Sequence, residues 1–230
     1  MSIQAIKLLS FDLDNTLYDN RPVIRVAESK NKEYLSQEFK KQNIDFDFEE
    51  FLSIRNELMN LKDQGGNNYN NQLENLTYLR HQVLKRFCER LNDSEQICQT
   101  ALDLFLQYRS QVSVPKEIIR LLNSLCERFV VVSVTNGNCD PYQTSMGKYF
   151  KKHYAPNHGF RAKPHQHMLE TIKQDFDVRS ENILHIGDQL DTDGKAAENA
   201  NCQFYQFSPF ELGQSVSDSC EQLIAHLQHH

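Results

Sequence analysis

Four short runs rich in β-branched and aromatic residues constrain the fold of this chain more than any other feature. They are residues 6–11, 129–134, 182–186 and 202–207. The second and third runs are almost continuously apolar, which is typical of strands covered on both faces. Helical patterns separate the runs, and a clear one begins with Pro115 in its first turn and has an apolar stripe of Ile118, Leu121, Leu122 and Leu125. This alternation predicts parallel strands joined by right-handed crossovers, and therefore an α/β core with a parallel sheet.

Residues 19–112 do not fit the alternation. They contain no convincing strand and read as about four amphipathic helices, with a turn-rich break at 65–71. We therefore expect an all-helical domain, 19–112, inserted into a core formed by 1–18 and 113–230.

Composition excludes several classes of protein. The mean hydropathy is -0.62, and no apolar run approaches the roughly 18 residues that span a bilayer. A formal net charge of -6 argues against nucleic-acid or anionic-membrane partners. The six cysteines show no CxxC pair or zinc-finger spacing, and the first residues lack a signal-peptide pattern. These features predict a reduced chain in the cytoplasm.

Paired carboxylates follow the first run, in Asp12-Leu13-Asp14-Asn15-Thr16. Carboxylates at i and i+2 after a buried strand point into the crevice where open α/β sheets bind ligands. Close carboxylates repel, so one tends to stay ionised while the other becomes neutral, unless a cation neutralises both. That difference suits a nucleophile and a general acid. Taken alone, a capping or turn pair explains the two aspartates equally well.

Further polar groups follow the other strands. The run 129–134 ends in Thr135-Asn136-Gly137, the run 182–186 ends in Gly187-Asp188, and Lys163-Pro164 lies between them. Pro164 is a residue type that can open a helix and so direct the preceding lysine. Each group has a purely structural explanation, as a turn threonine, a surface lysine or a capping aspartate. Their joint occurrence at one edge of a sheet favours an active site.

The order of these polar groups and their placement after apolar runs resemble the four motifs of the haloacid dehalogenase (HAD) superfamily. The matching residues are Asp12-x-Asp14-x-Thr16, Thr135, Lys163, and Gly187-Asp188 with Asp193 beyond. The resemblance runs from Ile6 to about Phe207. It implies a Rossmann-like core with a helical cap between the first two motifs, as in subfamily I. Residues 17–24 are similar to bacterial flavin-pathway phosphatases, which act on flavin mononucleotide and 5-amino-6-(5-phospho-D-ribitylamino)uracil. One departure is 194–197, Gly-Lys-Ala-Ala, where that group tends towards an apolar residue and paired glycines.

The resemblance implies catalytic roles for two aspartates and a magnesium ion as cofactor. Asp12 would attack the phosphate and form an aspartyl-phosphate, and Asp14 would protonate the leaving alcohol and later deprotonate water. Mg2+ would be held by the Asp12 carboxylate, the Asp14 backbone carbonyl and Asp188.

It also implies residues that bind phosphate and residues that support the site. Thr135, the backbone N–H of Asn136 and Lys163 would bind the phosphate oxygens. Thr16 would orient Asp14, and Asp193 would be a supporting carboxylate.

Other functions remain open. The chain could hydrolyse another small metabolite, such as a sugar phosphate or a nucleotide. A 2-haloacid dehalogenase is a further alternative, although dehalogenation needs neither magnesium nor a second acid two residues after the nucleophile. A non-enzymatic phospho-accepting domain is the last, and the large insertion after the first strand argues against it. We expect a small phosphorylated metabolite as partner, no nucleic acid or membrane, and a monomer or weak homodimer.

Overall fold

The computed structural model describes residues 6–63 and 71–228, so nearly all of the turn-rich stretch at 65–71 lies outside the described residues. The chain divides into two compact units, which are considered separately. One consists of Met1–Asn20 and Val112–His230, and the other of Arg21–Gln111. These boundaries lie within two residues of the expected ones.

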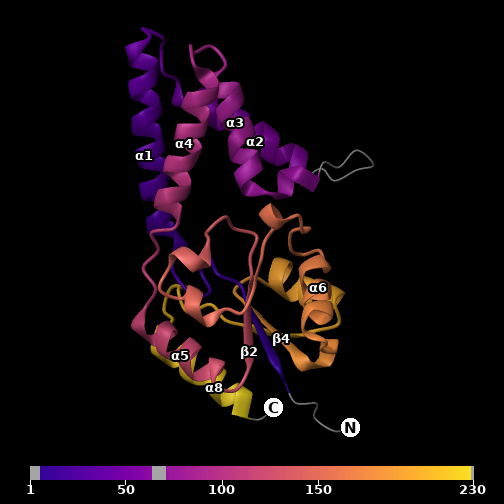
Figure 1. The fold of residues 1–230 in the computed structure, drawn as a ribbon. Coiled ribbons are helices and arrows are strands. Elements are labelled where there is room, and N and C mark those ends of the chain that lie inside the picture. Colours follow the sequence, from indigo (N-terminus) through magenta and orange to yellow (C-terminus); the bar gives the residue numbers. More distant parts are fainter. Residues whose placement is uncertain (1–5, 64–70, 229–230) are drawn as a thin grey trace. The chain divides into compact units, whose positions relative to one another are not determined.

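The first unit is built on a five-stranded sheet with the order β3-β2-β1-β4-β5, in which every neighbouring pair is parallel. Two of its strands, β2 and β4, are labelled in Figure 1. The strands are β1 Leu8–Phe11, β2 Val130–Val134, β3 His153–Tyr154, β4 Ile183–Gly187 and β5 Gln203–Gln206. The expected α/β class with a parallel sheet is confirmed. The edge strand β3 was not predicted, because two residues carry no readable periodicity. Since β1 lies between β2 and β4, the carboxyl ends of these three strands are neighbours.

Helices cover both faces of the sheet. They are α5 Lys116–Cys126 and α8 Val216–Gln228 on one face, and α6 His167–Phe176 and α7 Lys195–Asn199 on the other. Side chains alternate along a strand. Leu9 and Phe11 of β1 accordingly join the apolar cluster with α5 and α8, whereas Leu8 joins the cluster with α6 and α7. Burial on both faces explains the continuous apolar runs. The predicted stripe of α5 is buried throughout.

Two expected proline positions need correction. Pro115 precedes α5 as its N-cap residue instead of lying in the first turn. Pro164 does not open a helix, because α6 begins only at His167, and the Lys163–Pro164 peptide bond is cis.

The second unit is helical in the part that the structure describes, with an apolar core of its own. Its helices are α1 Asn20–Lys41, α2 Phe48–Asp63, α3 Leu76–Cys88 and α4 Ser94–Arg109, with a short 3-10 turn at Asn71–Glu74. Aromatic rings pack at its centre, and Phe39 and Phe87 stack with centroids 4.9 Å apart. The buried Asn31 side chain donates a hydrogen bond to the Ala101 carbonyl and so joins α1 to α4. That this unit caps the active site stays a prediction.

Within residues 6–63 and 71–228, no helix combines the length and apolar character needed to cross a bilayer. All six cysteines lie in these ranges and are present as thiols.

Candidate active site

The loop after β1 presents the paired aspartates. The Asp12 N–H extends the sheet ladder by donating to the Ile186 carbonyl at 2.8 Å. The chain then turns sharply at Asn15, whose positive φ of 58° an asparagine tolerates. The Asn15 N–H donates to the Tyr18 carbonyl at 2.8 Å and closes the turn. The Asp12 side chain is thereby buried, while Asp14 is half-buried.

A lysine ammonium connects three distant segments of the chain. Lys163 Nζ donates to Asp12 Oδ1 at 2.6 Å, to Asp193 Oδ1 at 2.6 Å and to the Val134 carbonyl at 2.8 Å. The Lys163 side chain is only 2% exposed. An ammonium carries three N–H donors, and all three have acceptors here. This full pairing is what makes the burial of the charge tolerable.

The side chain of Asn136 clamps the backbone of Lys163. Its Oδ1 accepts from the Lys163 N–H at 2.7 Å, and its Nδ2 donates to the Lys163 carbonyl at 2.8 Å. The family resemblance implied a role only for the backbone N–H of Asn136. The preceding Thr135 is buried, and its hydroxyl oxygen accepts from the Gly137 N–H at 3.0 Å, so its own hydrogen can be donated to an anion.

Three carboxylates gather beside this lysine. The ligand atoms of Asp12, Asp188 and Asp193 all lie within 4.8 Å of one another. Asp188 directly follows β4, and Asp193 belongs to a π-helical turn, Leu190–Gly194. A Cβ atom on Gly187 would collide with the Asp193 carboxylate, so a glycine at the end of β4 allows this turn to fold back.

The structure corrects the expected role of Thr16. Its hydroxyl lies 3.2 Å from Asp12 Oδ2 and 3.5 Å from Asp188 Oδ1, so it does not orient Asp14 as predicted. The tight turn after Asp12 carries the threonine back over the first aspartate. Asp14 instead accepts a hydrogen bond from the hydroxyl of Tyr18.

Burial and charge shift the pKa values of these groups in opposite directions. Burial, together with the neighbouring carboxylates, raises the pKa of Asp12 to about 7 although Lys163 opposes the shift. Burial and Asp193 raise the pKa of Asp188 to about 6. Burial also acts on Asp193, but the Lys163 ammonium and the hydrogen bond from His185 hold its pKa below the ordinary range. Burial opposes the charge of Lys163, yet the two carboxylates beside it raise its pKa.

These charges fit a divalent cation. When all are ionised, the three carboxylates and one ammonium leave two negative charges uncompensated in a largely buried site. The raised pKa values of Asp12 and Asp188 express that excess. Carboxylate oxygens are the hard ligands that Mg2+ prefers. The donor set therefore suits a hard cation of charge two.

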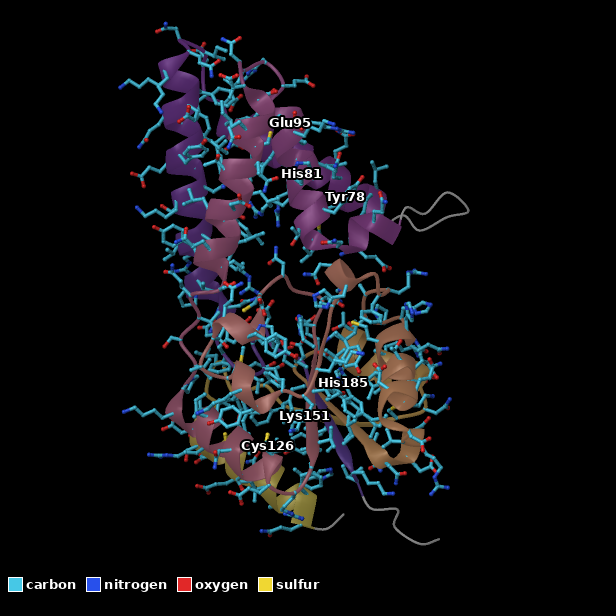
Figure 2. All side chains as sticks on the ribbon, viewed as in Figure 1. Tyr78, His81, Glu95, Cys126, Lys151 and His185 are labelled. Carbon is cyan, nitrogen blue, oxygen red and sulfur yellow. The ribbon has the colours of Figure 1, made fainter. Side chains whose placement is uncertain are left out.

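Sequence reasoning missed a buried histidine next to this cluster. His185, in the middle of β4, is fully buried and contacts Asp193 and Ser10. Its label in Figure 2 lies over the sheet. A signal was available, since His185 interrupts an otherwise apolar strand. Two hydrogen bonds to Asp188 were also missed. The side chains of Gln206 and Ser208 donate to the backbone carbonyl of Asp188 at 3.2 and 3.3 Å.

Comparisons with known proteins connect this geometry to a family. A family model described as haloacid dehalogenase-like hydrolase matches residues 6–201. The chain is 27% identical over 227 residues to the 5-amino-6-(5-phospho-D-ribitylamino)uracil phosphatase YigB of Escherichia coli K12, covering 97% of this chain and 92% of that protein.

Two solved structures share the fold. A 2-haloacid dehalogenase of Pseudomonas syringae pv. Tomato DC3000 is similar with a TM-score of 0.82 and 23% identity, over 96% of this chain and 99% of that one. A HAD phosphatase of Thermococcus onnurineus has a TM-score of 0.66 and 18% identity, over 96% and 98% of the two chains. With its family match over most of its length, and with the motif residues assembled at the carboxyl edge of a parallel sheet, the chain belongs to the haloacid dehalogenase-like hydrolases and is an enzyme of that family.

Proposed function

We propose that this enzyme is a magnesium-dependent phosphomonoester hydrolase that acts through an aspartyl-phosphate. We propose a flavin-pathway phosphate as its substrate, either 5-amino-6-(5-phospho-D-ribitylamino)uracil or flavin mononucleotide. One observation carries the reaction type: Asp12 is held between the Lys163 ammonium and the Thr16 hydroxyl, and Asp14 is held separately by Tyr18. The Escherichia coli relative supports the substrate class.

In the first step, an Asp12 carboxylate oxygen attacks phosphorus, and the bond from phosphorus to the ester oxygen breaks. Asp14 donates a proton to the departing alkoxide, which leaves as an alcohol. The Thr135 hydroxyl donates a hydrogen bond to a phosphoryl oxygen, and the Lys163 ammonium places its positive charge beside the phosphoryl group, where negative charge accumulates in the transition state. The Tyr18 hydroxyl donates to Asp14 Oδ1 and so holds this carboxyl group in place.

In the second step, Asp14 removes a proton from water, and the water oxygen attacks phosphorus. The bond between phosphorus and Asp12 breaks, which restores the carboxylate and releases inorganic phosphate. Asp12, Asp188 and the Asp14 carbonyl would hold magnesium, with Asp193 beside them. Bound there, the ion supplies positive charge that offsets repulsion between these carboxylates and the phosphoryl group.

A dehalogenase reading is weaker. The 2-haloacid dehalogenase shares the fold at 23% identity, and fold alone does not assign chemistry. Asp14 and its Tyr18 partner have a use in protonating an alkoxide, but no use when a halide ion leaves.

A substrate panel with and without chelator tests the proposal. We expect the purified enzyme with Mg2+ to release phosphate repeatedly from p-nitrophenyl phosphate, and with a higher kcat/KM from the two flavin-pathway phosphates. EDTA should abolish turnover and excess Mg2+ should restore it. Halide release from 2-chloropropionate that survives EDTA, without phosphate release from any ester, would establish the dehalogenase instead.

The Asn136 clamp leads to a separate prediction. Asn136→Ala removes both hydrogen bonds to the Lys163 backbone, and a shift of about 1 Å in a positioning group costs about 100-fold in rate. We expect kcat/KM for p-nitrophenyl phosphate to fall by about 10- to 100-fold. Asn138→Ala is the matched control, since Asn138 lies in the same loop. Equal losses in the two variants would show that the clamp does not matter.

A further inference from the structure

We propose that His185 is a positioning residue of this hydrolase. It holds the Asp193 carboxylate, which in turn holds the Lys163 ammonium against Asp12. The inference rests on the proposed function, because it assigns Lys163 a role in phosphoryl transfer. The contacts that it uses are hydrogen bonds between side chains of this protein.

Contacts on both ring nitrogens fix the place of His185. Its Nε2 lies 3.1 Å from Asp193 Oδ1. Its Nδ1 lies 2.7 Å from the hydroxyl of Ser10 and 3.1 Å from the Ser10 carbonyl. Ser10 and His185 are paired in register across β1 and β4, and both are fully buried. The side-chain alternation of β4 puts His185 on the sheet face covered by α6 and α7, and Asp193 lies two residues before α7.

The contact with Asp193 and the shorter of the two contacts with Ser10 favour one tautomer. Asp193 Oδ1 accepts a hydrogen bond from the Lys163 ammonium, so His185 must meet it with an N–H on Nε2. In a neutral imidazole the other nitrogen is then an acceptor. The Ser10 hydroxyl, 2.7 Å away, can donate to it and lies closer than the Ser10 carbonyl at 3.1 Å, which could only accept. The Ser10 hydroxyl therefore supports the Nε2–H form of His185, which is the form that can bind Asp193.

This arrangement immobilises the Asp193 carboxylate. Oδ1 accepts from Lys163 Nζ at 2.6 Å and from His185 Nε2 at 3.1 Å, while Oδ2 accepts from the Gln189 N–H at 3.1 Å. Without the histidine, the carboxylate would lose a restraint against rotation. Lys163 would then follow it, because the two are only 2.6 Å apart. Loss of such supporting contacts typically costs 10- to 100-fold in activity.

The same sheet contains a matched control pair. Ser133 of β2 and His153 of β3 form the same contact, from Ser133 Oγ to His153 Nδ1 at 2.8 Å. Both residues are buried. Ser133 lies on the opposite face of the sheet, since its neighbours Val132 and Val134 belong to the α6 and α7 cluster. His153 packs beside the rings of Tyr142 and His158. The hydrogen bonds of Asp193 go instead to Lys163, His185 and Gln189.

Four variants compared with wild type separate positioning from stability. In His185→Gln the amide nitrogen can reach the place of Nε2, whereas in His185→Asn it reaches only the place of Nδ1. With p-nitrophenyl phosphate and saturating Mg2+, we expect His185→Asn to lower kcat by about 10- to 100-fold with little change in KM. His185→Gln should recover most of that loss. Ser10→Ala should lower kcat by a smaller factor, and Ser133→Ala should lower the Tm but leave kcat unchanged.

The inference is overturned if a folded His185→Asn variant keeps the wild-type kcat. It is also overturned if Ser10→Ala and Ser133→Ala lose kcat equally. Should the asparagine variant fail to fold, the two serine variants decide the question. Nitrogen-15 NMR of the His185 ring adds a test that does not depend on turnover. We expect the hydrogen on Nε2, and a hydrogen on Nδ1 alone would refute the inference. A wild-type enzyme that hydrolyses no phosphate ester would instead refute the proposed function.

Discussion

Replacing Asp12 by asparagine is expected to abolish multiple turnover, with kcat at least about 10⁴-fold below wild type. An amide oxygen is a poor nucleophile, so no aspartyl-phosphate forms. The fold should survive, because the asparagine Oδ1 can still accept from Lys163, which lies 2.6 Å from Asp12 Oδ1. Steady-state phosphate release from p-nitrophenyl phosphate measures the loss, and circular dichroism with a Tm measurement verifies folding.

Asp191→Asn is the control for this substitution. Asp191 is exposed and lies two residues before Asp193. The same chemical change there should leave kcat near the wild-type value. Appreciable multiple turnover by Asp12→Asn would show that another group is the nucleophile.

Replacing Lys163 by methionine is expected to damage activity and stability together. The variant keeps the length of the side chain but removes the ammonium from two carboxylates, each 2.6 Å away. Removing one partner of a buried ion pair costs about 3 kcal/mol, which corresponds to a Tm lower by about 10 °C for a chain of this size. Loss of the positive charge beside the transition-state phosphoryl group should lower kcat by about 10²- to 10³-fold.

The control is Lys152→Met. Lys152 also forms an ion pair, with Asp175 at 2.7 Å, but its side chain is 47% exposed. Exposed pairs contribute about 0–1 kcal/mol, so Tm and kcat should change little. If Lys163→Met melts no lower than Lys152→Met, then Lys163 does not compensate buried charge, and the electrostatic account of the site is wrong.

The arrangement of the motifs was predictable because it depends on chain topology. Apolar runs separated by helical stripes are local patterns, and parallel connection places every strand's carboxyl end at the same edge. Asp12, Thr135 and Asp188 follow β1, β2 and β4, which are adjacent in the sheet. Their gathering therefore required no knowledge of side-chain geometry.

Individual partners were not predictable in the same way. Thr16 was expected to orient Asp14, but its hydroxyl contacts Asp12 and Asp188. The hydrogen bond from the Tyr18 hydroxyl to Asp14 was not expected. Both residues lie in or beside the turn at Asn15, which the hydrogen bond from the Asn15 N–H to the Tyr18 carbonyl closes. Hydrogen bonds form over tenths of an ångström, whereas sequence patterns locate elements only to within a few residues.

The amino-acid pattern was sufficient for the parallel α/β core, the inserted helical segment and the residues that meet at one edge of the sheet, because hydrophobic periodicity is local and helical connections make successive strands parallel. The folded structure was needed to show that Asp12 and Asp193 share Lys163, that Asn136 clamps its backbone, and that His185 contacts Asp193. Such contacts depend on where buried turns place polar atoms, and inside a folded protein each buried polar atom must find whichever partner packing brings within reach.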